Sequence, residues 1–120
     1  ALVYEKTACT IVAHFDLVTK FMEAGLPLDC AHPRYRAAAD AALDALLKAP
    51  VLFEINTGAM SRGYRTTPYP DEFTLSRIAE KGGRVILSSD SHAADTLLFG
   101  FEDAMQLVKK HHLNLVSRLD

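Results

Sequence analysis

Short apolar runs alternate with amphipathic stretches about three times along the chain, and this alternation predicts βα units. The runs expected to form strands are Ala8–Ala13, Val51–Asn56 and Val85–Ser88. The first lacks polar alternation, so it is expected to be buried on both faces of a sheet. Leu113–Val116 is a candidate for a last short strand. Because strands joined by helical crossovers run parallel, the pattern predicts an α/β fold.

Three amphipathic stretches between these runs predict helices. One opens at Pro33 and continues to about Lys48, a second begins at Pro70–Glu72 with acidic residues in its first turn, and a third covers Phe101–His112. The segment Thr57–Tyr69 is rich in Gly, Arg, Thr and Pro and is long for a βα connection. We therefore expect an elaborated loop after the second strand.

Composition places all 120 residues in one soluble domain, since 49% are hydrophobic and 23% are charged. The formal charge of −2 gives no basic patch for nucleic acid and no attraction to a membrane surface. No apolar run approaches the roughly 18 residues that a membrane span needs. Two cysteines are too few for a disulfide framework, so a reducing, cytoplasmic setting is expected.

The size of the chain also bears on its architecture. A closed eight-stranded βα barrel needs about 250 residues, whereas three βα units leave a sheet with open edges. The chain begins without a signal peptide and without an initiator Met. We therefore expect residues 1–120 to be a partial barrel, the later half of a longer protein.

Each predicted strand is followed at its carboxyl end by polar side chains. In sheets built from βα units, these ends share one edge, where ligands bind. Asp-x-His at such an end suits divalent metal ions, and a further histidine at a second strand end strengthens the expectation. The six groups are His14, Asp16, Glu54, Asn56, Asp90 and His92.

Plainer roles remain open for the same side chains. Asp90 is also suited to capping a turn, and His92 to being a surface histidine. Glu54 could contact a ligand histidine or pair with an arginine of the next helix. Asn56 could donate a hydrogen bond to phosphate or close the turn that begins the long loop.

The long loop carries two arginines suited to phosphate binding, Arg62 and Arg65. A guanidinium group can donate to two phosphoryl oxygens at once. Lys20 is a weaker candidate of the same kind. The remaining histidines are expected to lie at helix ends without a functional role: His32, His111 and His112.

Four segments together resemble the histidinol phosphatases of the polymerase and histidinol phosphatase (PHP) family. They are Ile11–Leu17, Phe53–Gly58, Pro68–Pro70 and Leu87–His92, in this order and spacing, and the match covers nearly the whole chain. The resemblance implies the C-terminal half of that family's distorted seven-stranded βα barrel, with about three βα units.

The resemblance also implies a metal centre that holds up to three divalent ions, such as zinc, manganese or iron. It makes His14, Asp90 and His92 the metal ligands, with Asp90 and His92 also acting in catalysis. Arg62 and Arg65 would then hold the substrate's phosphate. The family's opening His-x-His motif, its bridging Glu and further histidines belong to an N-terminal half that this sequence does not contain.

The function implied is metal-dependent hydrolysis of L-histidinol phosphate to L-histidinol and phosphate, in histidine biosynthesis. Because the other ligands are missing, the isolated chain is expected to be nearly inactive. It would need the N-terminal half or a second copy of itself as a partner. Two alternatives stay open: another PHP-type phosphoesterase, acting on nucleotides or resembling the exonuclease module of a bacterial polymerase, and a catalytically incompetent fragment that pairs with another chain.

Overall fold

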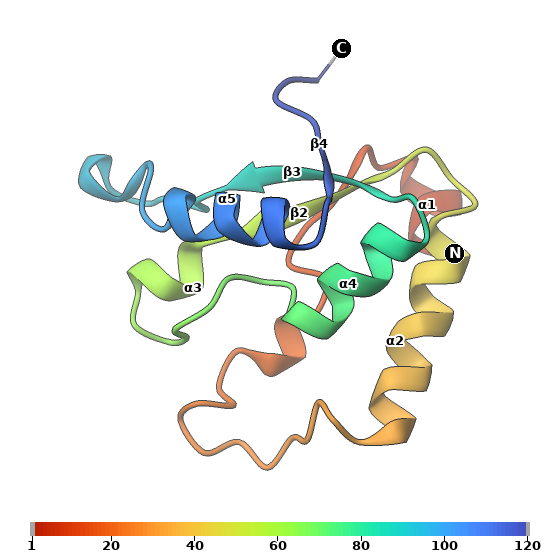
Figure 1. Cartoon of the computed structure of the whole chain (residues 1–120), viewed down its shortest axis with the longest axis horizontal. Coiled ribbons are helices and arrows are strands. Elements are labelled where there is room, and N and C mark those ends of the chain that lie inside the picture. Colours follow the sequence, from red (N-terminus) through yellow and green to blue (C-terminus); the bar gives the residue numbers. More distant parts are fainter. Residues whose placement is uncertain (1, 120) are drawn as a thin grey trace.

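A computed structural model describes residues 2–119 of the chain (Figure 1). The elements follow in the order α1 (Leu2–Thr7), β1 (Ile11–Val12), η1 (Leu17–Thr19), α2 (Pro33–Leu46), β2 (Leu52–Asn56), α3 (Gly58–Ser61), α4 (Glu72–Glu80), β3 (Arg84–Ser88), η2 (Ala94–Thr96), α5 (Phe101–Lys110) and β4 (Asn114–Leu115). The elements η1 and η2 are single turns of 3-10 helix.

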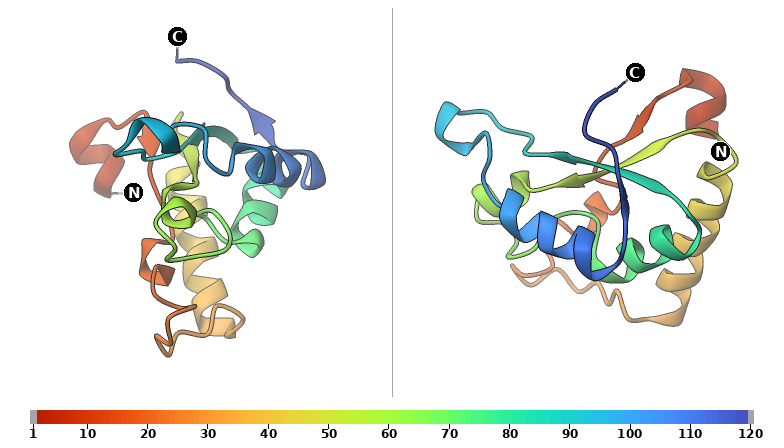
Figure 2. Two further views of the ribbon diagram at one scale, coloured as in Figure 1. Left: turned by 90° about the vertical axis from the view of Figure 1, so that its left-hand side faces the viewer. Right: turned by 45° about the horizontal axis from the view of Figure 1, so that its top comes forward.

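The four strands form one parallel sheet in the order β1-β2-β3-β4, which confirms the predicted α/β fold. In the register of the sheet, Phe53 on the central strand β2 pairs with Val12 of β1 and with Val85 of β3. Each strand therefore lies beside the next one in the chain. The crossover helices α2, α4 and α5 follow one another along one face of the sheet (Figures 1 and 2).

The hydrophobic core lies between this face and the three helices. Alternate side chains of a strand point to the same face, so Phe53 and Ile55 of β2 enter the core together. Burying a large apolar side chain fully contributes about 1.5 to 3 kcal/mol, which makes this layer the main support for the strand ends. The helices contribute Leu43, Leu46, Leu75, Ile78, Ala104 and Val108.

Two helices begin with side-chain caps. His32 caps α2 by accepting a hydrogen bond from the backbone N–H of Arg34 at 3.1 Å, which confirms its expected place at a helix start. Asp71 caps α4 by accepting from the backbone N–H of Thr74 at 2.8 Å. Both caps satisfy donors that have no partner inside the helix.

The prediction for the first strand is wrong in extent and burial. Within the expected segment Ala8–Ala13, only Ile11–Val12 forms a strand, and both residues are half-buried. The reason is its position, because β1 lies at the edge of the sheet and pairs with β2 alone. Before it stands the helix α1, which no sequence signal predicted.

Other expectations hold with small changes at the boundaries. The long loop after β2 contains the short helix α3, and β3 begins one residue earlier than expected, at Arg84. Cys9 and Cys30 are both free. None of the helices in residues 2–119 has the length and apolar character to cross a bilayer.

Candidate functional site

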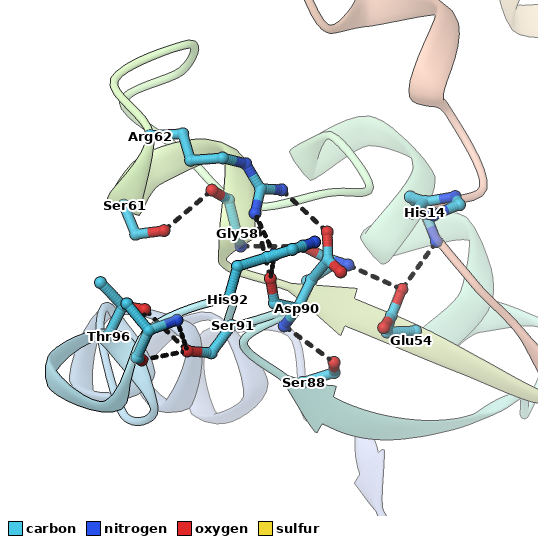
Figure 3. A network of polar contacts seen from close by, with 12 residues as sticks. His14, Glu54, Gly58, Ser61, Arg62, Ser88, Asp90, Ser91, His92 and Thr96 are labelled. Carbon is cyan, nitrogen blue, oxygen red and sulfur yellow. Dashed lines mark hydrogen bonds and ion pairs between the residues drawn. The ribbon is translucent and has the colours of Figure 1, made fainter.

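Parallel strands bring their carboxyl ends to one edge of the sheet, and five of the six predicted polar residues lie along it; Asp16 instead turns to the Asp71 backbone and Arg65. His14 follows β1, Glu54 lies near the end of β2, and Asp90 follows β3. Since β2 lies between the other two strands, Glu54 lies between His14 and Asp90 (Figure 3). The edge therefore has two parts, a buried one around Glu54 and a more open one around Asp90.

The buried part joins the ends of β1 and β2. The Glu54 carboxylate accepts a hydrogen bond from the His14 backbone N–H at 2.8 Å and another from Asn56 Nδ2 at 3.0 Å. The Asn56 side-chain oxygen accepts from the Gly58 backbone N–H at 2.8 Å and so closes the turn into α3. Glu54 thus contacts the backbone of His14, neither a histidine ring nor an arginine of the next helix. It fixes the place where His14 leaves its strand.

Arg62 organises the open part, because its guanidinium group reaches across from α3 to the end of β3. Arg62 Nη2 donates to Asp90 Oδ2 at 2.8 Å, and Nη1 donates to the Asp90 carbonyl oxygen at 3.0 Å (Figure 3). The His92 ring lies against the same carbonyl, with Nδ1 at 2.8 Å from it and 3.2 Å from Arg62 Nη1. We call Arg62, Asp90 and His92 the open cluster.

The contacts of His92 Nδ1 determine which ring nitrogen is free. A carbonyl oxygen accepts hydrogen bonds and arginine only donates them, so the 2.8 Å contact to the Asp90 carbonyl requires a proton on Nδ1. With Nδ1 protonated in the neutral ring, Nε2 keeps its lone pair. That nitrogen can accept a proton or bind a metal ion, and the backbone contact orients it, as in many histidine ligands.

Gly58 makes room for the open cluster. A Cβ atom at this position would lie 2.8 Å from Arg62 Nη2, 2.8 Å from the Ser89 carbonyl oxygen and 2.9 Å from Asp90 Cβ. These separations are too short for any other residue without movement of the neighbours. The sequence pattern Asn-Thr-Gly indicates only a turn at Gly58, and it does not indicate that the missing side chain makes room for Arg62.

The backbone is strained at two of the predicted site residues. His14 has φ +29° and Asp90 has φ +46°, both in the left-handed region that residues with a side chain rarely adopt. Such conformations cost on the order of 1 to 3 kcal/mol and concentrate at functional sites. Among residues 2–119, two other non-glycine positions share the feature, Ala8 and His112.

Arg65 lies apart from this edge, in a buried cluster with Asp16, Thr19 and Tyr69. Its Nη1 is 3.8 Å from Asp16 Oδ2 and donates to the Thr19 hydroxyl, while its guanidinium lies over the Tyr69 ring at 4.5 Å. Asp16 also accepts from the Asp71 backbone N–H at 2.8 Å. Burial raises the pKa of Asp16, and the lowering effects of this hydrogen bond and of Arg65 are smaller. We assign Arg65 a structural role.

The other cationic candidates also have partners elsewhere. Lys20 lies over the rings of Phe21 and Tyr64, with Nζ at 5.1 Å and 4.6 Å from their centres. The ring of His111 at the end of α5 lies 3.0 Å from the Glu72 carboxylate on α4. The first contact joins the segment after η1 to the loop after α3, and the second joins α5 to α4. Neither contact brings Lys20 or His111 to the carboxyl ends of the strands.

Residues 2–119 do not supply a complete donor set for a metal ion. Across residues 2–119, no three His, Cys, Asp or Glu side chains come together as a group that could hold an ion. At the open cluster, the Asp90 carboxylate is engaged by Arg62. The described residues therefore do not form the implied metal centre by themselves.

What these residues can do is bind an anion and move a proton. Arg62 offers a guanidinium fork at a surface that is about one-third exposed, and His92 offers a free Nε2. Both groups lie beside the carboxyl end of β3, with Arg62 at the end of α3 and His92 in the segment after β3. No protein-family model and no curated protein sequence matches this chain, so its function is inferred from these side chains and from the resemblance of its motifs.

Proposed function

We propose that the chain is the C-terminal part of a PHP-type phosphomonoesterase that hydrolyses L-histidinol phosphate. The observation that supports this most is the open cluster, where a guanidinium, a carboxylate and an imidazole meet at the carboxyl end of β3. These three kinds of group can each assist phosphate-ester hydrolysis, as a cation for the phosphoryl oxygens, an anionic ligand or base, and a proton carrier.

In this proposal, Arg62 binds the phosphate group. Its two terminal nitrogens can donate to two non-bridging oxygens, and its position on the loop after β2 leaves it open to solvent. His92 has one available ring nitrogen, Nε2, which gives a proton to the departing alkoxide of histidinol when it is not bound to a metal ion. Asp90 orients both side chains: its carboxylate accepts a hydrogen bond from Arg62, and its carbonyl oxygen contacts both Arg62 and His92.

The proposed enzyme also uses divalent ions, zinc, manganese or iron, which would activate water and neutralise charge when bound. His14, Asp90 and His92 are the groups of this chain proposed to reach them. The remaining ligands would come from an N-terminal half or from a second copy of the chain. The order β1-β2-β3-β4, with its crossover helices on one face, supports a partial barrel that such a partner would complete.

The test is phosphate release from L-histidinol phosphate with added manganese or zinc. The 120-residue chain alone should show negligible turnover, and the complete protein should hydrolyse the ester. In the complete protein, His92→Ala should lower kcat on the order of a hundredfold, because the variant loses the one ring nitrogen that can bind a metal ion or carry the proton. Arg84→Gln, at the opposite end of β3, is the matched control and should leave turnover unchanged.

Two results would contradict the proposal. Rapid turnover by the isolated chain would show that its site is not incomplete. A complete protein that ignores histidinol phosphate but cleaves nucleotide esters would identify another PHP-type phosphoesterase.

A second candidate is a catalytically incompetent chain that only pairs with another. The ion pair of the Asp90 carboxylate with Arg62 and the lack of a three-ligand group among residues 2–119 favour it. The metal content of the purified complete protein distinguishes the two. A stoichiometric, tightly held metal ion that is lost in Asp90→Asn supports the enzyme, whereas no bound metal supports the incompetent chain.

A further inference from the structure

Arg62 is proposed to hold the phosphate of the ester, and the organic half of the ester needs partners of its own. L-histidinol phosphate carries an ammonium group and an imidazole ring close to the carbon that bears the phosphate. A selective site therefore needs an anionic group and an apolar surface beside the phosphate-binding cation. Residues 93–100, which follow the open cluster along the chain, carry both kinds of group. We call this segment the arch.

Both ends of the arch are fixed beside the open cluster. Near its start, Thr96 Oγ1 lies 2.7 Å from the hydroxyl oxygen of Ser91, the residue between Asp90 and His92 (Figure 3). At its end, a Cβ atom on Gly100 would lie 3.3 Å from the Met60 side chain of α3, the helix that Arg62 directly follows. The arch therefore lies at the carboxyl end of β3, on the same side of the molecule as α3 (Figures 1 and 2).

The side chains of the arch are unusually open to solvent. Leu97, Leu98 and Phe99 are 58%, 74% and 46% exposed, and consecutive exposed apolar side chains are typical of a surface that contacts another molecule. Asp95 is also exposed, and within residues 2–119 its carboxylate has neither a hydrogen-bond partner nor an ion-pair partner. The arch therefore offers a free carboxylate and an apolar strip in one short segment.

We propose that the arch selects the substrate, and that it takes phosphate monoesters whose organic group carries an ammonium ion and a ring. Asp95 pairs with the ammonium ion, the apolar strip Leu97–Phe99 contacts the ring, and Arg62 holds the phosphate. This inference rests on the proposed function and adds the recognition of the organic half of the ester.

The order of charges along the site supports this orientation. The ester has a negative phosphate and a positive ammonium group on neighbouring parts, and the site has a positive Arg62 and a negative Asp95. The reverse orientation would place phosphate beside the carboxylate and ammonium beside the guanidinium, so both contacts would be repulsive. Charge complementarity therefore favours this ester over an ester whose organic half is neutral or anionic.

The experiment is an NMR titration of the 120-residue chain, without added metal, with four soluble monoesters. Methyl phosphate has no further group, aminoethyl phosphate adds an ammonium ion, phenyl phosphate adds a ring, and L-histidinol phosphate has both. The variants are Asp95→Asn and Leu98→Ser. Their matched controls, Glu5→Gln and Leu2→Ser, change exposed side chains of α1 at the opposite end of the sheet (Figure 1).

In the wild type, aminoethyl phosphate and phenyl phosphate should each bind at least about twofold more tightly than methyl phosphate. Asp95→Asn should bind aminoethyl phosphate and L-histidinol phosphate about two- to fivefold more weakly, the range of an exposed ion pair. Leu98→Ser should bind phenyl phosphate and L-histidinol phosphate about two- to fourfold more weakly, the effect of leaving roughly one methylene group in water. Neither variant should bind methyl phosphate more weakly, and the two controls should match the wild type.

Three results would overturn the inference, and they separate it from the proposed function. If methyl phosphate binding is lost in Arg62→Gln but the other esters bind no more tightly than methyl phosphate, the arch has no part in recognition and the role of Arg62 stands. If Leu98→Ser binds every ester as the wild type does, the apolar strip is a surface for something other than substrate. If the wild type binds none of the esters, the role of the arch and the role of Arg62 both fail in this chain.

Discussion

Two arginines that lie three residues apart on the loop after β2, Arg62 and Arg65, each form an ion pair with an aspartate. The two pairs share their chemistry and differ in how far they are exposed to solvent. In the pair Arg65–Asp16, the side chains are 7% and 1% exposed, whereas in Arg62–Asp90 they are 36% and 38% exposed. The buried pair is enclosed by Thr19, the Tyr69 ring and the Asp71 backbone. Around the exposed pair, the guanidinium N–H groups of Arg62 and the Nε2 atom of His92 can be reached by a ligand from solvent. Burial therefore separates a structural ion pair from one that is available for binding.

The buried pair also carries the larger desolvation cost of the two. Removing a carboxylate from water is costly, and burial raises the pKa of Asp16 despite the nearby Arg65. Asp16 Oδ1 and the Tyr69 hydroxyl are buried without a hydrogen-bond partner in the described structure. The pair therefore matters to stability mainly because removal of one partner would leave the other as an uncompensated buried charge.

Breaking the buried pair should give the largest effect. Arg65→Ala should lower the free energy of unfolding by about 3 to 5 kcal/mol, because it leaves Asp16 buried without its partner and removes packing from the Tyr69 ring. Urea unfolding followed by circular dichroism measures this. A loss below about 1 kcal/mol, the range of exposed pairs, would contradict the contrast.

Crowding the exposed pair should come next. Gly58→Ala should destabilise the chain by about 1 to 3 kcal/mol, since a Cβ there meets the Ser89 carbonyl, which cannot yield as a side chain can. It should also displace Arg62 from Asp90. Gly82→Ser is a control for a glycine with open space around it, although its φ of +71° carries its own strain. A Gly58→Ala variant as stable as the wild type would show that the contact is not tight.

The raised pKa of Asp16 predicts a pH effect of a definite sign. The folded state holds this proton more tightly than the unfolded state, so the resulting stabilisation is complete below the unfolded-state pKa and is lost as pH rises through the folded-state pKa. Asp16→Asn cannot titrate there. Urea unfolding of both proteins between about pH 3 and pH 7 should show the wild type losing stability relative to Asp16→Asn as pH rises. A constant difference, or one of opposite sign, would contradict the assignment.

Opening the exposed pair should have the smallest effect on folding and a clear effect on binding. Arg62→Gln should change the free energy of unfolding by less than about 1 kcal/mol. Its affinity for methyl phosphate should fall roughly tenfold or more, since a charge-assisted contact is worth about 1.5 to 3 kcal/mol. Calorimetry with Arg84→Gln as the matched control measures this, and unchanged phosphate affinity in Arg62→Gln would count against the proposed role.

Much of the fold could be predicted from the sequence, because it follows from local pattern. Strong periodicity predicted three helices and the strand Val51–Asn56, and parallel pairing then brought His14, Glu54 and Asp90 to one edge. The strand at β1 was overestimated because sequence does not reveal that a strand lies at an edge with a single neighbour.

The sequence could not separate Arg62 from Arg65, which share one loop and one residue type. Their difference comes from the path of the loop, which returns beside β2 through paired backbone hydrogen bonds between Asn56 and Tyr69. Arg65 lies close to this return and is buried, whereas Arg62 lies farther from it and is exposed. Such a path depends on packing between distant segments, which local pattern does not encode.

The most direct test of the central claim follows the two arginines in one sample. Side-chain Nε–Hε signals of Arg62 and Arg65, assigned by NMR with the variants Arg62→Gln and Arg65→Lys, are recorded during a titration with methyl phosphate. The proposed role of the open cluster predicts that the Arg62 signal moves in a saturable way while the Arg65 signal stays in place. Movement of Arg65 alone, or no movement of either signal, would contradict it.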